Sequence, residues 1–145
     1  MSLDDLYQEI ILDHGRRPRN FGELDERTHE AEGFNPLCGD EVRVHVLLNG
    51  DRIEDIRFSG RGCAISTASA SMMTQVIKGK TVEQAFELFD QFRKAVTSDS
   101  DGEADLGELD CLTGVRRFPT RVKCATLAWH AMKTALAGGG KTTTE

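Results

Sequence analysis

The first hydrophobic residues of the chain recur with helical spacing. Apolar residues three or four positions apart form one face of an amphipathic helix, and those at the N-terminus are Leu3, Leu6, Tyr7, Ile10 and Ile11. This pattern predicts a helix that ends near Gly15. Residues 15–37 then keep no period of either kind. We expect an ordered loop there, whose charged centre, residues 23–32, has room for a short strand or turn.

Hydrophobic residues at every second position follow this loop. They are Val42, Val44, Val46 and Leu48, and a second apolar run follows with Ile53, Ile56 and Phe58. Asn49 and Gly50 lie between the two runs, and both residue types tolerate the positive φ angles of a tight turn. The pattern therefore predicts a β-hairpin.

Helical spacing returns in three further segments. Residues 63–79, 81–96 and 119–136 each carry an apolar stripe, and the third segment begins with a proline, a residue favoured in the first turn of a helix. Thr81, followed three residues later by Gln84, resembles a capping box. We expect three helices after the hairpin.

The remaining segments are short of apolar residues or irregular. Residues 97–108 are rich in acidic residues, serine and glycine, which predicts an exposed loop. Residues 106–115 form a short apolar turn or helix in this interpretation. Residues 138–145 offer no apolar face, so we expect a disordered tail after a single domain of residues 1–137.

Composition and charge narrow the classes of function. Hydrophobic residues make up 39% and charged residues 29% of the chain, and the net charge is −6 with a pI near 5.2. An acidic surface does not favour nucleic acid or anionic lipid as partners. No apolar run approaches the length of about 18–20 residues that a membrane span needs, and the N-terminus has no basic, apolar leader. We expect a cytoplasmic protein.

Three of the four cysteines lie where predicted elements meet. Cys38 precedes the hairpin, and Cys63 and Cys124 lie near helix starts, where the helix dipole stabilises a thiolate. In a reducing compartment such thiols more often bind metals or react than form disulfides. Cys111 has no such setting, and we assign it to packing or partial exposure. The four histidines have no metal-ligand spacing.

Cys38, Gly39 and Asp40 add a carboxylate next to the first thiol, because the glycine lets the backbone turn between them. The sequence therefore predicts one site made of three cysteines and Asp40, suited either to zinc or to iron in a cluster. An aspartate ligand favours a working site over a closed structural one, since structural zinc sites normally use only cysteine and histidine.

Five runs of residues resemble the U-type iron–sulfur cluster assembly proteins, the family of IscU scaffolds, the N-terminal domain of NifU, and SufU. They are Leu6-Tyr7 to Asp13-His14, Pro18 to Gly22, Asn35 to Asp40, Gly60 to Ser66, and Arg121 to Trp129. The resemblance implies an α+β fold, a small antiparallel sheet with helices packed on one face, similar to SufE and NifU. This agrees with the predicted hairpin followed by helices.

Two departures from IscU scaffolds resemble the SufU branch. The stretch between Cys63 and Cys124 is longer than in those scaffolds, and Lys123 stands where they have a histidine. Residues 118–122 replace the proline-rich segment at which a chaperone binds scaffolds of the IscU type. This replacement argues against cluster delivery assisted by that chaperone.

The resemblance to SufU implies a set of metal ligands, a sulfur acceptor and partners for the site. Zinc would be held by Cys38, Asp40, Cys63 and Cys124, and Cys38 would accept persulfide sulfur from a SufS-type cysteine desulfurase. Arg121 would pair with Asp40 once that carboxylate leaves the metal, as a guanidinium binds a carboxylate through two hydrogen bonds. A downstream scaffold of the SUF system or apoproteins would receive the sulfur.

Two other functions fit the same residues. As in IscU relatives, Cys38, Cys63 and Cys124 with Asp40 would hold a [2Fe–2S] cluster, or iron, that is built on the protein and passed to apoproteins. The third reading is a zinc-stabilised interaction domain without chemistry. Whether the chain is an enzyme depends on this choice: the sulfur acceptor resembles a sulfurtransferase, whereas a scaffold is not an enzyme.

Overall fold

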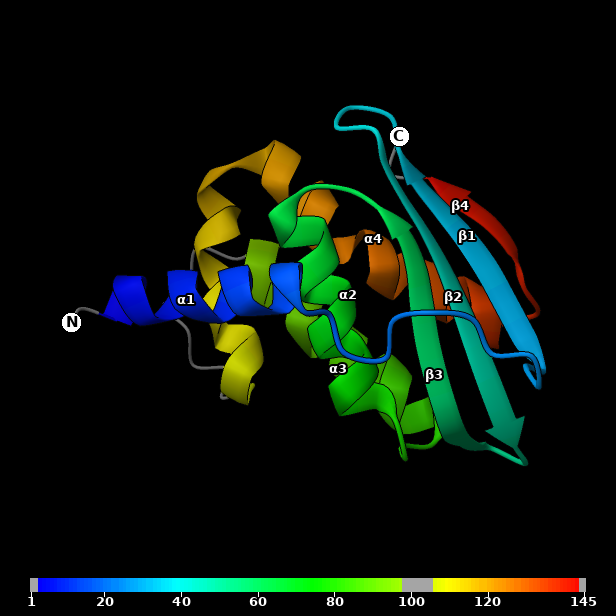
Figure 1. The fold of residues 1–145 in the computed structure, drawn as a ribbon. Coiled ribbons are helices and arrows are strands. Elements are labelled where there is room, and N and C mark those ends of the chain that lie inside the picture. The colour runs from blue at the N-terminus through cyan, green and yellow to red at the C-terminus, as the bar shows by residue number, and fades with distance from the viewer. Residues whose placement is uncertain (1–2, 98–105, 144–145) are drawn as a thin grey trace.

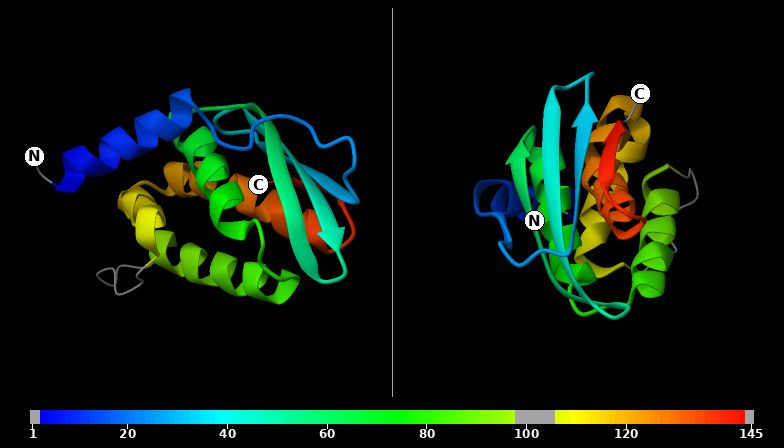
Figure 2. Two further views of the ribbon diagram at one scale, coloured as in Figure 1. Left: turned by 60° about the horizontal axis from the view of Figure 1, so that its bottom comes forward. Right: turned by 90° about the vertical axis from the view of Figure 1, so that its right-hand side faces the viewer.

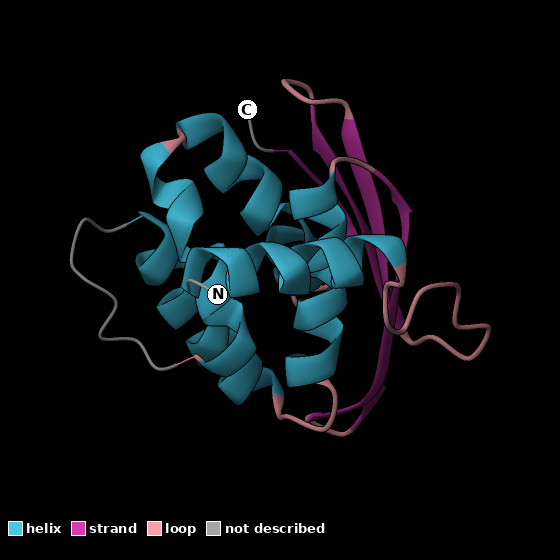
Figure 3. Cartoon of the chain, turned by 60° about the vertical axis from the view of Figure 1, so that its left-hand side comes forward, coloured by secondary structure: helices cyan, strands magenta, loops and turns pink. Residues whose placement is uncertain are grey.

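The computed structural model describes residues 3–97 and 106–143 as a sheet with helices on one of its faces (Figures 1 and 3). The predicted acidic loop therefore lies largely outside the described residues. The elements in chain order are α1 (Leu3–Arg16), β1 (His29–Asn35), β2 (Asp40–Asn49), β3 (Arg52–Arg61), α2 (Ala64–Ile77), α3 (Val82–Thr97), the 3-10 helix η1 (Gly107–Arg117), α4 (Pro119–Leu136) and β4 (Gly140–Thr143). None of the helices in the described ranges is long and apolar enough to cross a membrane.

The predicted elements are present with small shifts at their ends. β2 and β3 form the expected hairpin. The expected capping box opens α3: the Thr81 N–H donates to Gln84 Oε1 at 3.0 Å, and the Gln84 N–H donates to Thr81 Oγ1 at 3.2 Å. The apolar segment after the acidic loop is η1, which buries Leu109 and Leu112. The helical and alternating patterns thus located most of the fold.

The sheet has the strand order β3-β2-β1-β4, with β2 antiparallel to both β3 and β1. β1 starts inside the segment expected to hold a short strand or turn and extends beyond it to Asn35. Its inward positions are small or polar. A Cβ atom on Gly33 would lie 3.1 Å from side-chain carbons of Leu127 and Val42, so this strand approaches α4 closely and shows no hydrophobic alternation in the sequence.

The expectation of a disordered tail is wrong for residues 140–143, which form β4. This strand pairs parallel with β1, with Ala31 opposite Gly140 and Phe34 opposite Thr143 (right view of Figure 2). Pairing through the main chain needs no apolar side chains, and it covers an edge of β1 that would otherwise be open. Gly139 has a φ of 89°, and a Cβ there would lie 2.8 Å from the Glu30 carbonyl oxygen. The tail glycines therefore permit the strand.

The hydrophobic core lies between the inner face of the sheet and α2, α3 and α4. Its centre is Trp129, fully buried and stacked on Phe92 with ring centroids 4.6 Å apart. The indole N–H donates to Ser69 Oγ at 3.1 Å, which satisfies the one polar atom of this side chain. A buried side chain of this size stabilises the fold by about 2–3 kcal/mol. The core fixes how α2 and α4 approach the strands.

A buried histidine fastens α1 to the body of the protein. His14 Nε2 lies 2.6 Å from Glu108 Oε1 in η1, and Nδ1 lies 2.7 Å from Ser71 Oγ in α2. Because Ser71 Oγ also accepts the Arg19 N–H, its own proton is available to Nδ1. The imidazole proton then belongs on Nε2, which donates to the Glu108 carboxylate. Three elements meet at this side chain.

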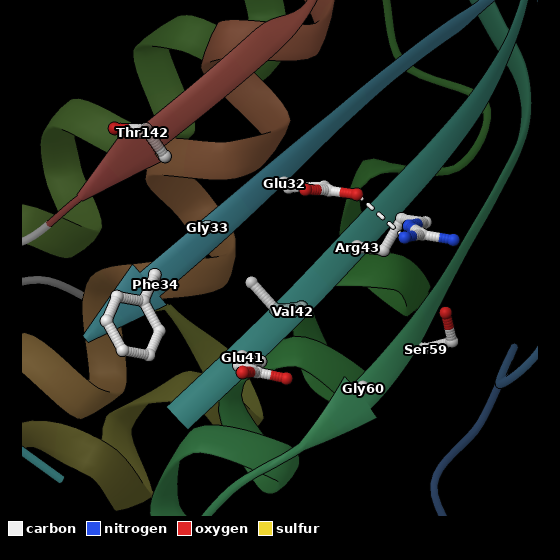
Figure 4. A pocket seen from close by; sticks show the side chains of 9 residues that line it. All are labelled: Glu32, Gly33, Phe34, Glu41, Val42, Arg43, Ser59, Gly60 and Thr142. Carbon is white, nitrogen blue, oxygen red and sulfur yellow. Dashed lines mark hydrogen bonds and ion pairs between the residues drawn. The ribbon is translucent and has the colours of Figure 1, made fainter. Parts of the chain in front are cut away.

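The outer face of the sheet is covered at one end only. The loop before β1 crosses it, burying Leu24, whose N–H donates to Nδ1 of the buried His45 at 3.1 Å. At the other end a groove of about 640 Å³ remains open, with the exposed Phe34 and the ion pair between Glu32 and Arg43 in its wall (Figure 4). This groove contains none of the cysteines and is not the predicted site.

Candidate metal centre

The residues predicted to form one site come from four places in the chain. Cys38 lies in the turn between β1 and β2, and Asp40 is the first residue of β2. Cys63 is the N-cap of α2, directly after β3, and Cys124 lies in α4. The β1–β2 turn, the end of β3 and the start of α2 lie in the upper part of Figure 1. The fold brings distant segments to one end of the sheet.

Three of these residues converge closely. One ligand atom each of Cys38, Asp40 and Cys124 lies within 4.8 Å of the other two, and the two Sγ atoms are 3.3 Å apart. In a tetrahedral zinc site with Zn–S bonds of about 2.3 Å, ligand sulfurs are separated by about 3.8 Å. Two thiols and a carboxylate at this spacing suit a metal ion that prefers sulfur and oxygen donors.

Cys63 lies beside this group, and its Sγ has a different contact. The sulfur accepts the Ser66 N–H at 3.4 Å and so caps α2, while the Cys63 N–H donates to Asp40 Oδ1 at 3.0 Å. The thiol is exposed. The structure therefore brings the main chain of Cys63 into contact with Asp40, while its sulfur is not one of the ligand atoms that lie within 4.8 Å of one another.

The environment of Cys124 differs from the one expected. The prediction placed it near a helix start that stabilises a thiolate, but its side chain is buried beneath the site, one turn further into α4. Burial, with hydrogen bonds to Asp40 and Cys38, raises the pKa of the Cys124 thiol far above its usual range. Without a cation the sulfur keeps its proton. As a metal ligand Cys124 would give up that proton, since the charge of a coordinated ion would favour the thiolate.

Asp40 is fully buried and held by two donors. Besides the Cys63 N–H, the side-chain amide of Asn35 reaches Asp40 Oδ2 at 3.3 Å. Gly62 leaves the room for the carboxylate, because a Cβ there would lie 2.7 Å from Asp40 Oδ1. Sequence reasoning did not single out Asn35 or Gly62, although both lie in the motifs that carry the resemblance. Neither residue type is a usual zinc ligand, so the search for ligands did not reach them.

The other two candidates lie apart. Arg121 is exposed in the first turn of α4, with its guanidinium stacked over the Phe118 ring at 4.6 Å. Cys111 is buried in η1, where its Sγ contacts the sulfur of Met72 at 3.8 Å, and burial raises the pKa of its thiol to about 12. The assignment of Cys111 to packing is confirmed.

A family model described as the NifU-like N terminal domain matches residues 6–139. The chain therefore belongs to the NifU-like N-terminal domain family. It is 45% identical over 137 residues to the zinc-dependent sulfurtransferase SufU of Bacillus subtilis, covering 94% of this chain and 92% of that protein. It is 44% identical over 135 residues to the iron–sulfur cluster assembly scaffold protein IscU of Streptococcus pyogenes, covering 92% and 84%.

Solved structures agree on the fold. The crystal structure of a putative iron–sulfur cluster assembly scaffold protein for the SUF system from Fervidobacterium islandicum has a TM-score of 0.83 and 35% identity, covering 93% of this chain and 99% of that one. A NifU-like N-terminal protein from Brucella abortus has a TM-score of 0.82 at 22% identity, covering 93% and 94%. The predicted α+β fold is confirmed, with β4 as a parallel addition to the antiparallel strands.

Proposed function

We propose that this protein works in iron–sulfur cluster assembly as a zinc-dependent acceptor of persulfide sulfur from a cysteine desulfurase of the SufS type. The observation that carries the proposal is the convergence of two thiols and a carboxylate, of which Cys38 is exposed while Asp40 and Cys124 are buried. The similarity to a zinc-dependent sulfurtransferase supports the same function.

In this proposal Cys38, Asp40, Cys63 and Cys124 hold zinc. The donors fit, since three thiolates and one carboxylate complete a tetrahedral set. When bound, zinc would keep the thiols deprotonated while lowering their nucleophilicity. The oxygen of Asp40 is the hardest of the four donors and the one most readily exchanged. Such a site is stable at rest and can open at one ligand.

Cys38 is the residue best placed to accept sulfur. It lies in an exposed turn, between Leu37, which is 63% exposed, and Gly39, which has a φ of 72°. A partner can reach this sulfur without disturbing the buried pair. The Cys38 thiolate attacks the terminal sulfur of the desulfurase persulfide: a new S–S bond forms on Cys38 as the old one breaks, and the desulfurase cysteine leaves as a thiolate. No net oxidation or reduction occurs.

Arg121 completes the proposal as a partner for a displaced Asp40 carboxylate. Its guanidinium is exposed and lies one helical turn before Cys124. To pair with Asp40 it would leave the Phe118 ring, an exposed cation–π contact of about 0.5–1 kcal/mol, for a charge-assisted hydrogen bond of greater strength.

The sulfur recipients in this proposal are a SUF-system scaffold or apoproteins. We place them in the cytoplasm, where free thiols persist, because all four cysteines are free.

A scaffold function is the second candidate. It is favoured by the similarity to IscU proteins and by the thiol-rich site, because thiolates also hold [2Fe–2S] clusters. Failure to assemble a cluster anaerobically from iron, cysteine and a desulfurase would count against it.

The deciding experiment measures desulfurase turnover on cysteine under reducing conditions. The enzyme is assayed alone, with the zinc-loaded protein and with the metal-stripped protein. We expect strong stimulation that requires zinc, and a persulfide on Cys38 by mass spectrometry. Cys38→Ser should abolish the stimulation, whereas Cys111→Ser, a matched change at a buried thiol outside the site, should not. Stimulation that is absent, or equal without zinc, would contradict sulfur acceptance and leave the scaffold function.

A further inference from the structure

Asn35, the last residue of β1, touches three parts of the candidate centre. Its side chain is fully buried. The amide nitrogen Nδ2 lies 3.3 Å from Asp40 Oδ2 and 3.5 Å from Cys124 Sγ. On its other side, Oδ1 accepts the Leu37 N–H at 3.3 Å, and the Asn35 carbonyl oxygen accepts the Gly39 N–H at 2.9 Å. One residue therefore contacts both buried ligands and the turn that carries the exposed one.

The chemistry of a primary amide suits this place. The NH₂ group has two protons, and its oxygen accepts hydrogen bonds. An ionised carboxylate and a thiolate are acceptors only, so each can take one proton of the amide and keep another lone pair for a metal ion. A ligand whose second partner is fixed is also fixed in orientation, which is how residues behind metal ligands raise metal affinity.

Asn35 also holds the turn that carries Cys38. The Leu37 N–H and the Gly39 N–H flank Cys38 in sequence, and both donate to Asn35. Asn35 therefore holds the turn that carries Cys38 from both sides, in addition to the direct contact between the Cys38 and Cys124 sulfurs.

We propose that Asn35 is a positioning residue of the metal centre: its amide aims the Asp40 carboxylate and the Cys124 thiolate at the ion and ties the Cys38 turn to them. This inference rests on the proposed zinc site. It assigns metal affinity and ligand geometry to a residue that does not itself bind the metal.

The test compares Asn35→Asp with the wild-type chain. Aspartate has the same shape but replaces the NH₂ donors with an oxygen, which places a third acidic group against Asp40 and Cys124. Asn35→Ser, which is small and uncharged, is the second variant in case the first does not fold. Asn49→Asp makes the same chemical change in the exposed β2–β3 turn, at the far end of the sheet, and is the matched control.

Two readouts report on the metal centre independently of sulfur transfer. Zinc affinity is measured by competition with a chromophoric chelator, and the visible spectrum of the Co²⁺-substituted protein reports the ligand geometry. We expect both Asn35 variants to lose affinity by about 10–100-fold and to change the cobalt spectrum, and Asn49→Asp to do neither. Circular dichroism and urea unfolding of the metal-free forms establish that each variant folds.

The outcomes separate this inference from the proposed function. If both Asn35 variants bind zinc as tightly as the wild type with an unchanged cobalt spectrum, Asn35 does not position the ligands. A loss of metal-free stability with an unchanged spectrum and affinity would likewise make Asn35 only a structural residue. If the wild type binds zinc but no sulfur reaches Cys38, the proposed function fails and this inference stands. A wild-type chain that binds no zinc overturns both.

Discussion

Replacing Gly62 by alanine tests whether the Asp40 carboxylate lies where the structure has it. The added Cβ would lie 2.7 Å from Asp40 Oδ1 and 3.2 Å from Ser66 Oγ, whereas ordinary contact begins at 3.4 Å. Gly62 does not have a positive φ, so alanine strains the backbone little. The substitution therefore acts mainly through the contact with the carboxylate.

The size of the effect follows from that contact. The carboxylate must retreat by about 0.7 Å from ordinary contact with the new methyl group, and the Cys63 N–H bond to Oδ1, now 3.0 Å, is stretched or lost. A hydrogen bond to a charged group contributes about 1.5–3 kcal/mol. Alanine in place of glycine offsets about 0.4–1 kcal/mol of this loss, because it restricts the conformations of the unfolded chain. We expect the free energy of unfolding of the metal-free protein to fall by about 1–2 kcal/mol.

Urea unfolding and zinc competition measure this prediction. Zinc affinity should fall by about tenfold or more, because one ligand is displaced. Gly114→Ala is the matched control: a Cβ at Gly114 meets nothing within 4 Å, and its φ is not positive. This variant should leave zinc affinity unchanged, and its free energy of unfolding should be equal to that of the wild type or slightly higher. If Gly62→Ala matches Gly114→Ala in both measurements, the buried position of the Asp40 carboxylate is refuted.

Three further predictions concern other sites. Burial, together with nearby Arg27, lowers the pKa of His45 below its usual 6.5. As pH falls, the unfolded chain therefore takes up this proton before the folded chain does. The free energy of unfolding should decrease below about pH 6.5, and it should decrease less in His45→Gln. Because burial raises the pKa of Cys111 to about 12, iodoacetamide at pH 8 should leave this thiol unmodified in the native, metal-stripped protein while alkylating Cys38; equal labelling would contradict its burial. Gly139→Ala, which places a Cβ 2.8 Å from the Glu30 carbonyl oxygen, should detach β4 and speed amide hydrogen exchange in β1; unchanged exchange would mean that β4 does not protect that strand.

The sequence was most informative where side chains determine structure. The helices and the hairpin follow from the spacing of large apolar residues, and the capping pair at Thr81 and Gln84 marked the start of α3 correctly. Cys38, Asp40, Cys63 and Cys124 were expected to form one site; the ligand atoms of three of them converge, and that of Cys63 is not in this group. Periodicity and the chemistry of donor atoms were sufficient for these features.

The sequence did not predict features that depend on main-chain pairing or on how the elements pack together. β4 pairs with β1 through backbone groups, and Gly33 replaces a hydrophobic residue because α4 lies close above it. The burial of Cys124 depends on how α4 packs on the sheet, so its raised pKa could not be read from its place near a helix start. Asn35 was overlooked because an amide is not among the usual zinc ligands, and its proposed role depends on two contacts across the fold.

The candidate centre has a consequence for how the protein is made. Its residues come from the β1–β2 turn, the start of α2 and the helix α4, so a ribosome releases the last of them only after the three antiparallel strands and the helices α1 to α3. Until then Cys38 and Cys63 lack the partner that buries one side of the site. Because ligands this far apart in sequence meet only in the folded chain, metal binding stabilises the completed fold and not its precursors. Loading with metal should therefore follow the synthesis of α4 and act as a check that this helix has packed on the sheet.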